Sequence, residues 1–218
     1  MKEKKRNITD LILNLAIIVT TVAAIGQYFA GGPDALGSSR TGCFRYFTTD
    51  SNVLAVLASL TLLPICIKRI RKPETEIPRW LLIFKYTATV SVTITLLTVV
   101  FFLAPTAAAR GGIAGYFRFF EGNTFVLHFS TPVLAILAFC LLEKNRKMTF
   151  RESLWTLIPT VVYSLVYAAA VIFMKVWTDW YGFTFGGKLY LAPVSGIVMY
   201  LVTLGVAAIV GRTGPKQK

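Results

Sequence analysis

The chain has 218 residues, of which 55% are hydrophobic and 15% are charged, and its mean hydropathy is +0.64. Soluble domains have about 45–50% apolar and about 25% charged residues, so the composition excludes an ordinary soluble domain and indicates a membrane protein. In a soluble protein the net charge of +13 would suggest nucleic acid as a partner. Here the basic residues cluster in short connections between apolar runs, which is a membrane-topology pattern, and we exclude nucleic acid.

Six apolar runs of about 20 residues each match the thickness of the hydrocarbon core and predict an all-α, polytopic membrane protein. The expected helices cover residues 8–30, 44–67, 80–103, 123–143, 154–174 and 190–210 of a single transmembrane domain, 1–218. The first run is longer than a typical signal-peptide core, so we expect a retained helix. The segment 107–122, rich in glycine and arginine, is expected to form a loop after Pro105.

The distribution of basic residues predicts the orientation. Sixteen of the 23 lysines and arginines fall in the N-terminal segment, in the connections 68–79 and 144–151, and in the tail after residue 210. Basic residues are in excess on the cytoplasmic side, so we expect both termini in the cytoplasm of a protein of the cell membrane. Lys85 lies within the third run, near enough to its start for its ammonium group to extend to the lipid headgroups.

The second helix opens with five consecutive polar residues: Thr48, Thr49, Asp50, Ser51 and Asn52. At helical spacing Thr48, Ser51 and Asn52 share one face, while Asp50 points elsewhere. A carboxylate in a membrane helix is costly and suggests a functional role. The alternative is that Asp50 lies near the interface and that the hydroxyl groups bond one helix to another.

The fourth helix carries His128, the only histidine of the chain. Under the expected topology the second and fourth helices both enter from the outer side, so His128 and Thr48 lie at a similar depth. Pro132 removes the backbone donor that the His128 carbonyl would use in an α-helix. We therefore expect a kink at the histidine, with a carbonyl left for a neighbouring helix, a side chain or water.

The three cysteines are Cys43, Cys66 and Cys140. Their spacing matches no metal site, and a single histidine makes a structural zinc site improbable. They are interpreted as small core residues. No metal and no cofactor are expected.

Three segments resemble a group of uncharacterised bacterial six-helix membrane proteins. They are residues 44–52 (Phe-Arg-Tyr-Phe-Thr-Thr-Asp-Ser-Asn), residues 122–128 with Pro132, and residues 180–183 (Trp-Tyr-Gly-Phe). The group is distantly similar to the androgen-induced-protein family of eukaryotic membrane hydrolases, which cleave fatty-acid esters of hydroxy fatty acids. The resemblance implies that Thr48 is the nucleophile and His128 its partner. Asp50 and the doublet with Thr49 depart from the eukaryotic pattern, so Thr49 is an alternative hydroxyl.

The implied chemistry is coherent. A threonine hydroxyl needs a base within hydrogen-bond reach, and a neutral imidazole serves as one near pH 7. Asp50 could orient the imidazole, although its angular offset from Thr48 argues against both contacting one ring.

The sequence contains no recognisable oxyanion hole. Asn52, or Tyr163 and Tyr167 of the fifth helix, could donate hydrogen bonds to the oxyanion.

Other interpretations remain open. The Thr48 hydroxyl could bond its own helix, and His128 could be a packed side chain bonded to a neighbouring helix. The first functional hypothesis is an intramembrane hydrolase of fatty-acyl esters whose substrate is a membrane lipid. The alternatives are a small solute or proton-coupled transporter, for which polar residues in a proline-kinked interior also fit, and a non-catalytic membrane accessory protein. The substrate and the oligomeric state are not defined by the sequence.

Overall fold

A computed structural model describes residues 2–31, 40–143 and 146–213, and every regular element in these ranges is helical. Six of its helices are long and apolar enough to cross a membrane, as the apolar runs predicted. The first two spans are α1 (Lys2–Phe29) and α2 (Phe47–Arg71), with the short η1 (Arg40–Arg45) before α2. The third comprises α3 (Arg79–Thr98), η2 (Val99–Leu103), α4 (Ala104–Phe117) and η3 (Arg118–Phe120).

The other three spans also consist of several segments. The fourth comprises α5 (Gly122–Phe125), η4 (Val126–Ser130), α6 (Thr131–Leu137) and η5 (Ala138–Glu143). The fifth comprises α7 (Phe150–Trp155), α8 (Leu157–Ala168) and η6 (Ala169–Phe173), and the sixth η7 (Leu189–Leu191) and α9 (Ala192–Arg212). Segments η2, η4, η5 and η6 are π-helical, so each shifts the hydrogen-bond register of its span.

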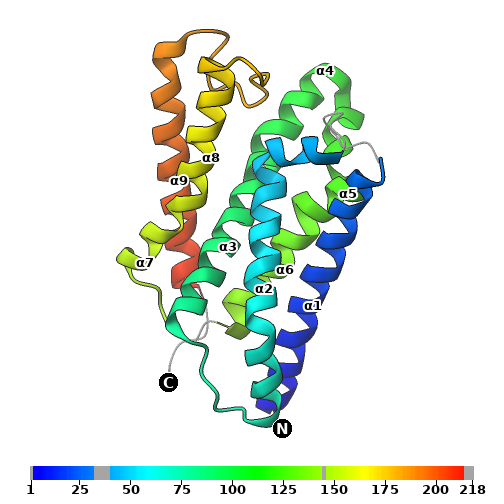
Figure 1. Ribbon diagram of the computed structural model, residues 1–218, viewed down its shortest axis with the longest axis vertical. Helices are drawn as coiled ribbons and strands as arrows, with labels where there is room; N and C mark the ends of the chain where they lie inside the picture. Colours follow the sequence, from blue (N-terminus) through cyan, green and yellow to red (C-terminus); the bar gives the residue numbers. More distant parts are fainter. Residues whose placement is uncertain (1, 32–39, 144–145, 214–218) are drawn as a thin grey trace.

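The spans form two groups around α3 (Figure 1). Helices α1, α2 and α6 pack on one side of α3, and the hairpin of α8 and α9 packs on the other side. Residues 85–95 of α3 are all buried, which fits its central place. The start of α1 and the end of α9 lie at the same end of the bundle, here called the terminal end. Segment η1 and the connections between η3 and α5 and between η6 and η7 lie at the opposite end.

Helix α1 presents its polar side chains to the protein interior. Large apolar residues are exposed on one face: Ile8, Ile12, Leu15, Val19 and Val22. The buried face has the same alternating spacing of three and four residues and contains Asn7, Asp10, Asn14, Ile17, Thr21, Ala24 and Tyr28. In a bilayer the apolar face can contact lipid, whereas the polar groups need partners inside the bundle.

The third span differs from the expectation at its end. The helix does not stop near Leu103: it continues into α4, and most of the expected loop 107–122 is helical. Pro105 fits at the start of α4 because the preceding π-helical segment has already changed the register. The chain then turns back at Gly112, whose φ of 63° and ψ of −158° are non-helical. The return is so close that a Cβ at Gly115 would lie 2.6 Å from the Ala107 carbonyl oxygen.

Candidate functional site

The polar start of α2 lies beside a cavity of about 360 Å³ between α2, α3, η2, α8 and α9. Thr48 borders this cavity, whereas Thr49 is buried away from it and Asp50 does not line it. Adjacent residues on a helix point about 100° apart, which explains why one hydroxyl of the doublet faces the cavity and the other does not. The structure thus separates the two threonines that the sequence left as alternatives.

The wall of the cavity is mainly apolar. It includes Ile94, Val99, Phe102, Val198 and Met199. Hydroxyl groups from α2, α3, α8 and α9 interrupt this surface, among them those of Thr48, Thr98, Thr160 and Ser195. An apolar cavity with a few polar groups is the usual form of a site for a hydrophobic ligand.

The segment between η6 and η7 contributes Tyr181, Phe183 and Phe185 to the cavity wall. Asp179 holds this segment together. One carboxylate oxygen accepts from the Tyr167 hydroxyl and the Phe183 N–H, both at 2.9 Å. The other accepts from the Thr184 N–H at 2.8 Å and the Thr184 hydroxyl at 2.6 Å. Burial opposes ionisation, but these donors outweigh it and keep the pKa of Asp179 below its ordinary value.

Tyr181 brings a phenol to the cavity wall close to the start of α2. Burial raises the pKa of Tyr181, while hydrogen bonds involving the Tyr163 hydroxyl and the Phe47 backbone act in the opposite direction. The charge of Asp50 also contributes to the rise. Asp50 is therefore an electrostatic neighbour of Tyr181. In the described part of the chain, no hydrogen bond joins Asp50 to His128.

His128 lies in η4 and is 7% exposed. Its Nδ1 is 2.7 Å from the Phe119 carbonyl oxygen. A carbonyl only accepts, so Nδ1 carries the proton in the neutral ring and Nε2 is the basic nitrogen. His128 does not line the cavity, and no hydrogen bond connects it to Thr48 among the described residues.

Asn52 connects the segments that carry the two candidates. Its Nδ2 donates to the Thr48 carbonyl at 2.8 Å and to the Leu127 carbonyl at 2.9 Å. Ser51 also donates to the Thr48 carbonyl, at 3.0 Å, and shares a hydrogen bond of 2.8 Å with Thr95 of α3. The second turn of α2 therefore lies level with η4, and the predicted similar depth of the two motifs is consistent with these bonds.

All three suggested oxyanion donors are occupied in other contacts. Both hydrogens of the Asn52 amide are used by carbonyl groups, and the Tyr167 hydroxyl donates to Asp179. Tyr163 lines the cavity, but its hydroxyl donates to the Arg45 carbonyl at 2.7 Å. The Thr48 side chain thus faces the cavity without a fixed donor from these residues.

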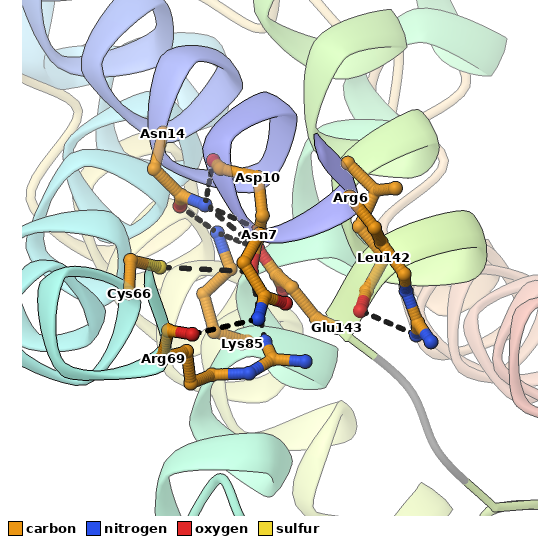
Figure 2. A network of polar contacts seen from close by, with 9 residues as sticks. All are labelled: Arg6, Asn7, Asp10, Asn14, Cys66, Arg69, Lys85, Leu142 and Glu143. Carbon is orange, nitrogen blue, oxygen red and sulfur yellow. Dashed lines mark hydrogen bonds and ion pairs between the residues drawn. The ribbon is translucent and has the colours of Figure 1, made fainter. Parts of the chain in front are cut away.

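A second polar cluster, here called the ion network, lies nearer the terminal end (Figure 2). Arg69 of α2 pairs with Asp10 of α1 at 3.0 Å, and Lys85 of α3 pairs with Glu143 of η5 at 3.2 Å. Asn14 joins the pairs because its Nδ2 donates to Asp10 Oδ1 at 3.1 Å and to Glu143 Oε1 at 3.0 Å. The network thus contains two cations and two carboxylates from four spans, with no net formal charge.

Further hydrogen bonds involve Lys85 and Asp10 of the network. Lys85 donates to Asn14 Oδ1 at 2.8 Å and to the Ser59 hydroxyl at 3.1 Å. The Cys66 thiol donates to Asp10 at 3.6 Å. The expectation that Lys85 extends to the headgroups is wrong, because Lys85 is 2% exposed and Glu143 lies within ion-pair distance.

Sequence reasoning did not identify the ion network. The polar positions Asn7, Asp10 and Asn14 follow helical spacing on one face of α1, which was a usable signal for a buried polar stripe. The partners Arg69 and Glu143 lie at the ends of apolar runs, where charged residues are ordinary.

The three cysteines are buried, in agreement with their interpretation as small core residues. Among the described residues, no group of three or more histidine, cysteine, aspartate or glutamate side chains could hold a metal ion.

Comparisons with family models, with curated proteins and with solved structures gave no match to this chain. The resemblance to the androgen-induced-protein family therefore rests on two short sequence motifs alone, residues 46–48 and His128 with the following Pro132. The structure itself supports a multi-pass membrane protein, because six of its helices are candidate membrane spans.

Proposed function

We propose that the protein is an intramembrane hydrolase that cleaves a fatty-acyl ester with Thr48 as the nucleophile. The observation that carries this proposal is the position of Thr48 at an apolar cavity within the span region. A hydrocarbon chain would occupy the apolar wall, and its ester would lie beside the Thr48 hydroxyl. The position of Thr49 outside the cavity supports Thr48 over its neighbour.

In the proposed reaction, Thr48 Oγ1 attacks the ester carbonyl and His128 Nε2 accepts the hydroxyl proton. The proton then passes to the leaving alcohol, and the acyl group remains on Thr48. Water, deprotonated by His128, releases the fatty acid and restores the hydroxyl. The bond from Nδ1 to the Phe119 carbonyl supports this role because it leaves Nε2 as the basic nitrogen. The proposal requires that Thr48 and His128 approach each other when the ester binds, as catalytic groups often do.

The test is ester hydrolysis by purified protein in lipid nanodiscs, with fatty-acyl esters of increasing chain length. Removing the base in His128→Ala should lower turnover about 10²–10⁴-fold. Thr48→Ala should abolish both turnover and covalent labelling by a fluorophosphonate probe, and Thr49→Ala is the matched control that keeps both. Full activity in Thr48→Ala, or no activity of the wild type on any ester, would refute the proposal.

A second candidate function is a proton-coupled or solute carrier, and the ion network is the observation that favours it. Four charged side chains lie inside the bundle, and such groups often mark ion pathways. None of the four borders the cavity at Thr48 or the larger one of about 530 Å³ beside α8 and α9. Solute flux or proton uptake in proteoliposomes, lost in Glu143→Gln and retained in Thr48→Ala, would favour the carrier.

We also infer that the terminal end faces the cytoplasm of a cell membrane. Residues 68–79 and residues 146–151 lie at this end, and the two connections 68–79 and 144–151 hold nine of the basic residues of the sequence. Segments with many basic residues stay in the cytoplasm.

A further inference from the structure

The fourth span contains a backbone carbonyl without a helical donor. In an α-helix the Leu127 carbonyl would accept from the Thr131 N–H, but that N–H bonds to Val126 in the π-helical register of η4. In the π-helical register the donor would be residue 132, which is proline and has no N–H. Both helical donors for Leu127 are thus lost. The prediction from Pro132 assumed the α-helical register and placed the carbonyl without a donor at His128, whereas in the π-helical register the carbonyl opposite Pro132 is that of Leu127.

Asn52 supplies the missing donor from another span. Its Nδ2 is 2.9 Å from the Leu127 oxygen and 2.8 Å from the Thr48 oxygen. Both neighbours are acceptors, so the amide cannot be reversed without placing three oxygens together. Asn52 is fully buried, and its Oδ1 has no hydrogen-bond partner among the described residues. An arrangement that leaves Oδ1 unpaired is costly, which indicates that its two donated bonds matter.

The same break occurs at Pro105, where its repair is different. The Ala104 N–H bonds to Val99 in the register of η2, and Pro105 has no N–H for Val100. The Tyr116 hydroxyl reaches the Val100 carbonyl at 3.4 Å. That donor comes from the same span and makes a long bond. At Pro132 the donor comes from α2, makes a shorter bond, and also binds the turn that carries Thr48.

We propose that Asn52 is a positioning residue that holds the backbone turns carrying Thr48 and His128 in a fixed relation, so that the two side chains alone reorient toward each other when an ester binds. One amide group binds the carbonyl of Thr48 and the carbonyl that precedes His128, so neither turn moves without the other. The catalytic part of this inference rests on the proposed hydrolase. The mechanical part, that Asn52 sets the position of the His128 ring, does not depend on it.

The experiment compares Asn52→Ala with Ser51→Ala, its matched control. Ser51 also donates to the Thr48 carbonyl but makes no bond to η4. Because His128 is the only histidine, ¹⁵N-histidine labelling of protein without a polyhistidine tag gives a single imidazole to observe. We expect the Nδ1–H tautomer in the wild type and in Ser51→Ala, and a mixture of tautomers or a shifted ring signal in Asn52→Ala.

Pro132→Ala separates positioning from simple helix repair. Asn52→Ala should lower the Tm by roughly 2–8 °C. When Pro132→Ala is added to Asn52→Ala, residue 132 again has a backbone N–H that can donate to the Leu127 carbonyl. The double variant should therefore recover much of the lost Tm, but it should not regain the imidazole signal of the wild type. If the double variant recovers both, or if Asn52→Ala leaves the signal unchanged, Asn52 only repairs the helix and the inference fails.

Turnover gives the third measurement. A displaced nucleophile and base should reduce kcat in Asn52→Ala by about 10²-fold, with little change in KM. Ser51→Ala should stay within a few fold of wild type. An inactive wild type would overturn the proposed hydrolase, while the imidazole signal and the Tm would still decide the role of Asn52.

Discussion

The protein places polar groups in two regions of the bundle that differ in kind. Near the terminal end, the ion network holds Asp10, Arg69, Lys85 and Glu143 in direct pairs. Toward the opposite end, the turn with Thr48 and the η4 segment use an amide, hydroxyl groups and an imidazole beside a cavity. Buried charges must be paired, whereas a neutral hydroxyl can remain at a cavity surface at modest cost.

We expect this difference to separate residues that stabilise the fold from residues that serve the proposed reaction. The ion network joins α1, α2, α3 and η5 through direct ion pairs and hydrogen bonds, with only Arg69 Nε and Glu143 Oε2 among the buried atoms of its charged groups lacking a hydrogen-bond partner within the described residues. We therefore expect it to stabilise and align the four spans. The Thr48 region has fewer direct bonds and an open space, so changes there should affect function more than folding. Substitutions in the two regions should therefore differ in how much they change the stability of the protein.

The largest effect should follow from breaking one ion pair of the network. Lys85→Met leaves Glu143 as an unpaired buried carboxylate and removes donors from Asn14 and Ser59. We expect a loss of about 3–5 kcal/mol in the free energy of unfolding. Reversible unfolding in mixed micelles measures this loss. The double variant Lys85→Met with Glu143→Leu should recover much of it; a double variant no more stable than the single one would show that the pair is not the cause.

Two aspartates provide a matched comparison between the regions. Asp10→Asn weakens the contact with Arg69 and should cost about 2–4 kcal/mol of unfolding free energy. Asp50 is half-buried and has no ion pair within the described ranges, so Asp50→Asn should change it by less than about 1 kcal/mol. The same unfolding assay applies to both. Equal losses would remove the proposed distinction between the two regions.

A smaller effect should follow from protonating Asp179 in the segment over the cavity. The folded-state pKa of Asp179 lies below its unfolded value of about 3.9. The ionised carboxylate therefore stabilises the folded segment fully above the unfolded pKa, and this stabilisation is lost as pH falls through the folded pKa. Trp177 and Trp180 lie in this segment and report on it by fluorescence. We expect a constant signal from pH 7 to about 4.5 and a change only below about pH 4. Asp179→Asn should remove that change, and an identical acid transition in this variant would assign it to another group.

The smallest perturbation tests orientation. Pro73→Cys places a thiol in the connection between α2 and α3, at the terminal end, in a chain whose native cysteines are buried. We expect an impermeant thiol reagent to label it in inverted vesicles and not in intact cells, with little effect on stability. Phe185→Cys, at the opposite end, is the control with the reverse pattern. Labelling of Pro73→Cys in intact cells would reverse the proposed topology.

Some features of the site were predictable because they depend on neighbouring residues. The polar face with Thr48, Ser51 and Asn52 follows from helical spacing, and both Ser51 and Asn52 donate to the Thr48 carbonyl. The disturbance before Pro132 follows from the missing N–H. The π-helical register did not follow, because the Leu127 carbonyl that it leaves without a helical donor bonds to a residue of another span. Asn52, 75 residues away from Leu127 in the chain, is that residue.

By itself, the sequence determined the all-helical class and the six candidate spans, because the length and apolarity of a run are local properties. Only the tertiary structure decided which polar residues meet. Asp10 and Arg69 are 59 residues apart, and Lys85 and Glu143 come from different spans. The tertiary structure also decided that Thr48 borders the cavity while Thr49 does not. Helical spacing defines the face of a residue, but the packing of neighbouring spans determines what that face contacts.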